Sequence, residues 1–84
     1  MVTVAMQRNP RAYERAQRTL GANMKRLRAE LRLTQVTAGY RAGLHWRHYQ
    51  KIEAGEVNIC LSSLVGIAVA LDTTIADLFL PEKR

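Results

Sequence analysis

The spacing of apolar side chains along the chain predicts a series of helices. Within residues 10–31 one set of apolar residues shares a single helix face: Leu20, Met24, Leu27 and Leu31. Asn9 and Pro10 form a typical helix start, with Asn as the cap and Pro at the first helical position. Gly21 leaves open whether one helix or two cover this range. Residues 61–71 repeat the pattern and predict another helix, with the stripe Leu64, Ile67, Ala68 and Leu71.

The segment between these stripes predicts two shorter helices joined by a turn. Thr34 is placed to cap a helix over residues 35–42, and Gly43 to end it in the left-handed conformation. Gly39 costs this helix roughly 1 kcal/mol relative to alanine, but its small size suits a point where two helices touch. We therefore expect tertiary packing to hold this helix.

The next predicted helix, residues 45–53, has one apolar and one polar face. Tyr49 and Ile52 would face the core, with Leu44 just ahead of them. The outward positions are Trp46, Arg47, Gln50 and Lys51.

A last short helix is predicted after Thr74, which stands three residues before Asp77 in the spacing of a capping box. Pro81 would end it. The pattern as a whole indicates an all-α fold: a compact five-helix bundle, with a helical extension at the N-terminus left open.

Length and composition limit the kinds of protein that the chain can be. Eighty-four residues suffice for one small domain, and no apolar run approaches the length of a membrane span. The opening MVTVAM is too short for the core of a signal peptide. Cys60 is the only cysteine, which fits a reducing compartment, so we expect a cytoplasmic protein.

The positive charge is concentrated in one part of the chain. Of the formal net charge of +6, residues 1–32 contribute +6, residues 33–60 contribute +1 and residues 61–84 contribute −1. Such a distribution favours a polyanionic partner, with nucleic acid ahead of an anionic membrane. A basic surface that is merely solvated remains the alternative.

Two short helices joined by a tight glycine-bearing turn form a helix-turn-helix unit, whose second helix enters the DNA major groove. From Leu20 to Phe79 the chain also resembles the Cro/phage-repressor type of helix-turn-helix domain, the XRE family. The matching text is LGANMKRLRAELRLTQ, AGLHWRHYQKIEAGEVN and LSSLVGIAVALDTTIADLF. The resemblance implies a lambda-repressor-like DNA-binding domain over residues 20–80. Residues 1–19 would then be a basic extension and residues 81–84 a frayed tail.

The resemblance also implies roles for individual residues. Base edges would be contacted from the recognition helix by Trp46, Arg47, Gln50 and Lys51. Phosphates would be contacted by Gln35, His45 and Asn58. Arg28 and Glu53 match a family pair that forms a partly buried salt bridge, which is a structural role.

The sequence departs from the family pattern at three positions. Ala38 stands where the family usually has Leu, which leaves room for looser packing of its helix. His45 replaces the usual Ser or Thr cap. Trp46 has one donor and a large apolar face, so it suits a thymine methyl group or DNA shape better than a hydrogen-bond pattern.

Other reactive side chains favour no enzyme, cofactor or metal site. His45 and His48 have helical spacing but lack a third ligand, so we expect a capping and a packing histidine. No set of nucleophile, base and orienting group is evident. For Cys60, at the start of a predicted helix, we favour an inert packing role over a redox-sensitive thiol.

The first twenty residues carry a basic face formed by Arg8, Arg11, Arg15 and Arg18. It could add phosphate contacts or simply be solvated. The opposite face would pack on the domain or on a second subunit through Ala12, Tyr13, Ala16 and Leu20.

We expect a sequence-specific, repressor-like transcriptional regulator that binds double-stranded DNA as a homodimer on an inverted repeat. The dimer would form through the last two helices, at exposed positions such as Val65, Val69 and Phe79. One alternative is an antitoxin-like or adaptor protein that uses the same fold to hold a protein partner. Another is a non-specific nucleic-acid binder.

Overall fold

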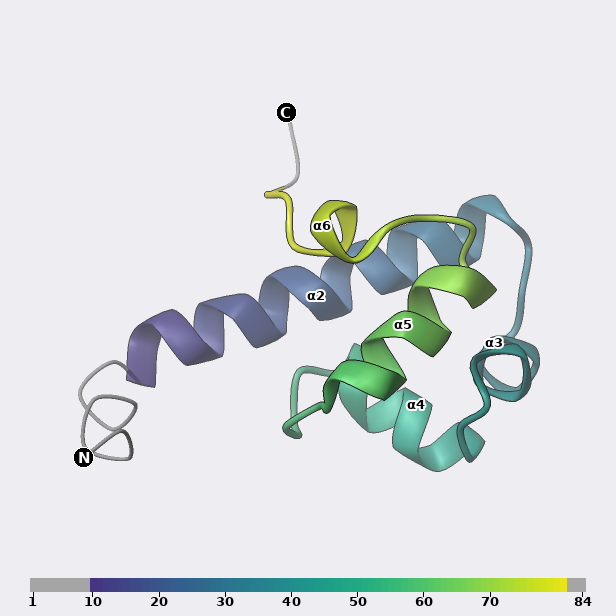
Figure 1. Cartoon of the computed structure of the whole chain (residues 1–84), viewed down its shortest axis with the longest axis horizontal. Coiled ribbons are helices and arrows are strands. Elements are labelled where there is room, and N and C mark those ends of the chain that lie inside the picture. Colours follow the sequence, from purple (N-terminus) through teal and green to yellow (C-terminus); the bar gives the residue numbers. More distant parts are fainter. Residues whose placement is uncertain (1–9, 82–84) are drawn as a thin grey trace.

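The protein is described by a computed structural model that covers residues 10–81 (Figure 1). Five helices make up this part of the chain: α2 (Pro10–Glu30), α3 (Gln35–Ala42), α4 (Trp46–Glu53), α5 (Leu61–Ala70) and α6 (Ile75–Leu78). The predicted all-α fold is confirmed for these residues. The predictions for Asn9, Arg8, the MVTVAM segment and residues 82–84 lie outside the described residues.

The first helix, α2, is one continuous helix of 21 residues, so Gly21 does not divide it. Gly21 is needed for a close approach instead, because a β-carbon there would clash with the backbone carbonyl of Glu53 at the end of α4. The N-terminal extension is helical from Pro10 on, but it forms the first part of α2 rather than a separate helix. In Figure 1 this part of α2 projects beyond the other helices.

The core lies between the C-terminal half of α2 and the other four helices. Its largest fully buried apolar side chains are Tyr49, Met24, Ile52, Ile67, Leu71 and Leu78. Leu31, predicted to continue the α2 stripe, is 42% exposed because the helix has already ended at Glu30. That part of the prediction is wrong.

Two close contacts fix the short helices against their neighbours. A β-carbon at Gly39 would lie 3.1 Å from the α-carbon of Trp46 and 3.3 Å from the β-carbon of Tyr49, so α3 and α4 touch at this glycine as predicted. A β-carbon at Gly66 would clash with the carbonyl oxygen of Ala42, so α5 also lies directly on α3. Ala38, between these contacts, is fully buried.

The predicted helix ends are close to those observed. Thr34 caps α3 by accepting the Thr37 N–H at 3.0 Å, and Gly43 ends that helix with φ of 76°. Thr74 caps α6 in the same way, by accepting the Asp77 N–H at 3.0 Å.

The helix predicted over 45–53 begins one residue later, since His45 is its cap. The helix predicted over 61–71 ends at Ala70, with Leu71 as its C-cap. No helix within residues 10–81 has the length and apolar character that a membrane span requires.

Candidate nucleic-acid interface

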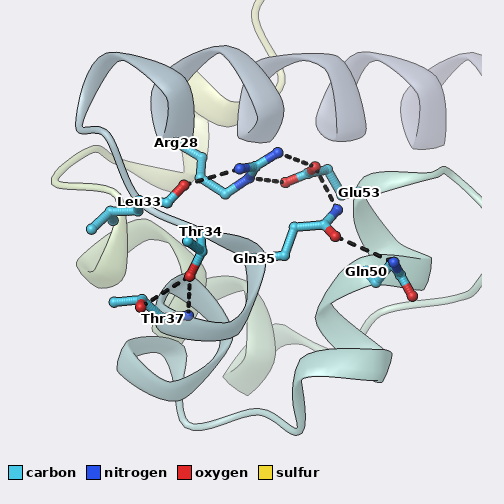
Figure 2. A network of polar contacts seen from close by, with 7 residues as sticks. All are labelled: Arg28, Leu33, Thr34, Gln35, Thr37, Gln50 and Glu53. Atoms are coloured by element: carbon cyan, nitrogen blue, oxygen red, sulfur yellow. Dashed lines mark hydrogen bonds and ion pairs between the residues drawn. The ribbon is translucent and has the colours of Figure 1, made fainter.

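Helix α4, the predicted recognition helix, is held to the rest of the domain by an ion pair at its C-terminal end (Figure 2). Arg28 of α2 donates from Nε and Nη2 to the two carboxylate oxygens of Glu53, each at 2.9 Å. A third guanidinium donor, Nη1, binds the carbonyl oxygen of Leu33 at 2.9 Å. The side chain of Glu53 is 5% exposed and that of Arg28 is 18% exposed, so water screens this pair little. Its hydrogen bonds to Glu53 raise the pKa of the Arg28 guanidinium above its ordinary value.

The same carboxylate binds the first residue of α3. Gln35 donates from Nε2 to Oε1 of Glu53 at 2.9 Å, and its Oε1 accepts a hydrogen bond from Nε2 of Gln50 at 3.3 Å. Figure 2 shows the resulting chain from α2 through α4 to α3 and back to the outer face of α4. A residue implied to contact phosphate is therefore hydrogen-bonded to a residue implied to contact bases. A shift of either helix would move both.

The N-terminal end of α4 brings together three consecutive ring and guanidinium groups. His45 caps the helix, because its Nδ1 accepts the backbone N–H of Arg47 at 3.1 Å. The His45 and Trp46 rings stack with centroids 6.3 Å apart, and the Arg47 guanidinium carbon lies 5.3 Å from the centroid of the Trp46 ring. A cation over an indole face is favourable, so this contact holds the Arg47 side chain against the Trp46 ring in the first turn of α4.

The two faces of α4 differ as the sequence pattern predicts. Tyr49 and Ile52 are buried, and burial raises the pKa of the Tyr49 phenol above its ordinary value, so this residue stays neutral. The outer face exposes Arg47, Gln50 and Lys51. Trp46 is partly buried rather than exposed, which corrects the expectation of a freely presented indole.

The loop after α4 carries Asn58, which is exposed between two partly buried neighbours. Val57 and Ile59 pack against the core cluster. The side chain of Asn58 accepts a hydrogen bond from the Tyr13 hydroxyl of α2. This contact joins the N-terminal extension to the loop that the resemblance implies for backbone binding.

Cys60 occupies the N-cap position of α5 without a capping hydrogen bond from its side chain, and it does not pack in the core. Its side chain is exposed, which contradicts the favoured packing role. Its sulfur lies 3.2 Å from the Ser62 hydroxyl and 3.4 Å from the Ser63 hydroxyl. Hydrogen bonds from these serines lower the pKa of the Cys60 thiol to about 7. The sequence pattern could not reveal this, because exposure depends on how the loop approaches the core.

His45 and His48 are both exposed, and within residues 10–81 no three His, Cys, Asp or Glu side chains come together as a metal site. Nothing in this part of the chain connects them to a third ligand. His45 acts as the predicted cap, whereas the exposed His48 is not a packing residue.

Two residues of α2 to which the sequence assigns no binding role contact the loop after α4. Tyr13 and Gln17 stand one turn apart on α2 and both bind the 57–58 loop. Tyr13 was assigned only to a packing face. The helical spacing with Leu20 was a signal that both residues turn toward the domain, but no local pattern identifies a partner forty or more residues away.

With this geometry established, comparisons with known proteins define the class of fold. The structure is similar to the restriction-modification controller protein C.AhdI from Aeromonas hydrophila, with a TM-score of 0.72 and 28% identity over 75% of this chain and 96% of that one. It is also similar to the hypothetical transcription factor NHTF from Neisseria, with a TM-score of 0.75 and 27% identity over 79% and 76% of the two chains. The clp gene regulator ClgR from Corynebacterium glutamicum has the same fold, with a TM-score of 0.70 and 21% identity over 75% and 67%.

These neighbours confirm the fold that the sequence resemblance implied. The chain has the helix-turn-helix fold of these proteins, the fold expected from its resemblance to Cro/phage-repressor domains. A scan against protein-family models and a search of curated proteins each find no match.

Proposed function

We propose that this protein is a sequence-specific DNA-binding transcriptional regulator, repressor-like in its action, with residues 20–80 as the DNA-binding unit. The carrying observation is the hydrogen-bonded chain that links Gln35 at the start of α3 to Gln50 on the outer face of α4. This chain holds Gln35, proposed to contact a phosphate, at a fixed separation from Gln50, proposed to contact a base. The similarity to a restriction-modification controller protein and to a hypothetical transcription factor supports the same class.

The exposed face of α4 would lie in the major groove. Arg47 can bind a guanine through two parallel hydrogen bonds, and Lys51, one turn further on, can reach a guanine or a phosphate. Gln50 can bind an adenine by its amide. The apolar face of Trp46 would contact a thymine methyl group.

Phosphate contacts would come from Gln35, His45 and Asn58. Gln35 stands at the N-terminus of α3, where unpaired backbone amides also favour an anion. His45 uses Nδ1 to cap α4, which keeps its Nε2 as a donor toward the DNA backbone. Asn58 is exposed on the loop after α4.

A homodimer would place two recognition helices on the half-sites of an inverted repeat. The outer face of α5 is apolar and exposed at Leu61, Val65 and Val69, with 67%, 48% and 72% of their surfaces accessible. Phe79 differs from the expectation, since it is partly buried against the core cluster and contributes only an edge. We therefore propose that α5 provides most of the contact between subunits.

The test is selection of bound duplexes from a randomised DNA pool at low and near-physiological salt. We expect an enriched inverted repeat that survives the higher salt. Binding without enrichment, lost as salt rises, would instead indicate a non-specific nucleic-acid binder. Failure to bind any duplex would favour the alternative in which the same fold holds a protein partner.

The enriched duplex then tests the recognition helix itself. Arg47→Ala should weaken binding by about 1–3 kcal/mol and relax the preference at one base pair. Arg41→Ala is the matched control, because it removes the same charge from an exposed arginine at the opposite end of α3 from Gln35. Equal losses for the two variants would contradict the assignment of α4.

A further inference from the structure

The N-terminal extension contacts the loop after α4 through a directed set of hydrogen bonds. Gln17 donates from Nε2 to the carbonyl oxygen of Val57 at 3.1 Å and to the Tyr13 hydroxyl at 3.2 Å. The Tyr13 hydroxyl in turn donates to Oδ1 of Asn58. The Tyr13 hydroxyl thus accepts a hydrogen bond from Gln17 and donates one to Asn58, an arrangement in which neighbouring hydrogen bonds strengthen one another.

This arrangement selects one of the two orientations of the Asn58 amide. An exposed asparagine can rotate its amide by half a turn, which exchanges an acceptor for a donor. The Tyr13 hydroxyl, which already accepts from Gln17, presents its proton to Asn58, so the amide oxygen turns toward it. The amide nitrogen, which donates to no partner among residues 10–81, is then available for an acceptor such as a phosphate oxygen.

The position of the loop depends on other contacts. Val57 and Ile59, on either side of Asn58, pack against the core cluster. Gly55 adopts a φ of 77°, and a β-carbon there would lie 3.6 Å from the carbonyl oxygen of Gln17, so the turn already rests on α2. Loss of the Tyr13 hydroxyl should therefore change the orientation of the Asn58 amide while the loop stays in place.

We propose that Tyr13, supported by Gln17, is a positioning residue that orients Asn58 for a contact with the DNA backbone. The proposal rests on the proposed function and names a role for the N-terminal extension. Residues 10–19 lie outside the part of the chain that resembles the family, so the resemblance assigns them no such role. It also makes Tyr13, which is exposed, and Gln17, which is partly buried, determinants of affinity without any contact of their own to DNA.

The test is a double-mutant cycle on Tyr13→Phe and Asn58→Ala, measured on the enriched duplex and on a shuffled one. Tyr13→Phe keeps the ring and removes only the hydroxyl. It should weaken binding by about 3–10-fold, the size of one neutral hydrogen bond. The affinity for both duplexes should fall by the same factor, because a phosphate contact carries no sequence information. In the Asn58→Ala background, Tyr13→Phe should have no further effect.

Tyr40→Phe is the matched control, since it removes the hydroxyl of a tyrosine on α3 that is 84% exposed. It should leave DNA affinity unchanged. The melting temperature of Tyr13→Phe should stay within about 2 °C of the parent protein, which shows that the loop and fold persist.

Four results would overturn the proposal. The same loss for Tyr13→Phe with and without Asn58 would show that Tyr13 acts on DNA by another route. A loss for Asn58→Ala but none for Tyr13→Phe would show that the amide needs no orientation. If Asn58→Ala has no effect while Arg47→Ala does, the positioning role fails and the proposed function stands; if neither variant weakens binding to any duplex, both fail.

Discussion

Two polar networks meet the recognition helix and its following loop, and they differ in burial and charge. The first joins Arg28, Glu53, Gln35 and Gln50, and its central carboxylate is almost fully buried. The second joins Tyr13 and Gln17 to the loop at Asn58; its groups are neutral, and the contact to Asn58 is exposed. Removal of a buried partner leaves a charge that water cannot reach, whereas water replaces a lost partner at the surface.

The difference implies that the two networks contribute to separate properties. The Arg28–Glu53 network connects α2, α3 and α4 through one carboxylate, so it should stabilise the fold and the proposed interface together. The Tyr13–Asn58 network contributes little to the free energy of unfolding but sets the orientation of one side chain. Substitutions in the two networks should therefore separate stability from DNA affinity.

The largest effect is expected for Glu53→Ala. The change leaves the Arg28 guanidinium, only 18% exposed, without its bidentate partner, and it also releases Gln35. The free energy of unfolding should fall by about 2–4 kcal/mol. This is somewhat less than the roughly 3–5 kcal/mol typical of a broken buried pair, because Arg28 is partly exposed. Urea unfolding measures this change, and DNA binding should fall with it.

Glu56→Ala is the control for this comparison. It removes the same charge from an exposed residue three positions further along the chain. We expect a change within about 0.5 kcal/mol, as for most surface substitutions. Similar losses at the two positions would show that net charge, and not the buried pair, accounts for the effect.

A smaller effect is expected at the helix caps, where the chain provides a matched pair. Thr34 and Thr74 each accept a backbone N–H three residues on, at 3.0 Å, but Thr34 begins α3 beside Gln35 whereas Thr74 begins α6. Each substitution to Ala should cost about 1 kcal/mol of unfolding free energy. Only Thr34→Ala should also weaken DNA binding, by roughly 2–5-fold, which is under about 1 kcal/mol. An equal effect of the two variants on DNA affinity would place α3 outside the interface.

The elements that the sequence predicted correctly are those with a local physical cause. The helical period, the Thr34 and Thr74 caps and the left-handed Gly43 all depend on residues within one or two turns. For the same reason the ends of α3 coincide with the prediction, and those of α4 and α5 differ by one residue.

The features that the sequence did not predict depend on distant partners. The low helix propensity of glycine suggests that Gly21 breaks the helix. The structure instead requires a glycine there because the backbone carbonyl of Glu53, more than thirty residues away, leaves no room for a β-carbon. The contact of Tyr13 with Asn58 spans 45 residues, and the exposure of Cys60 depends on the path of the loop. Tertiary contacts of this kind leave no periodic pattern to find.

The smallest effect is expected for the reactivity of Cys60, which lies two residues after Asn58 at the end of the loop that follows α4. Hydroxyl donors stabilise the thiolate and lower the pKa of Cys60 to about 7, so alkylation by iodoacetamide should reach half its plateau rate near that pH. Ser62→Ala removes the principal donor and should move the midpoint upward. The urea-unfolded chain is the control, with an expected midpoint near that of a free cysteine, about 8.5. The single cysteine makes the signal unambiguous. If the loop borders DNA, binding of the enriched duplex should slow the alkylation of Cys60 at every pH. An unchanged rate in the complex would mean that this loop, together with the Tyr13–Asn58 network, lies away from the DNA backbone.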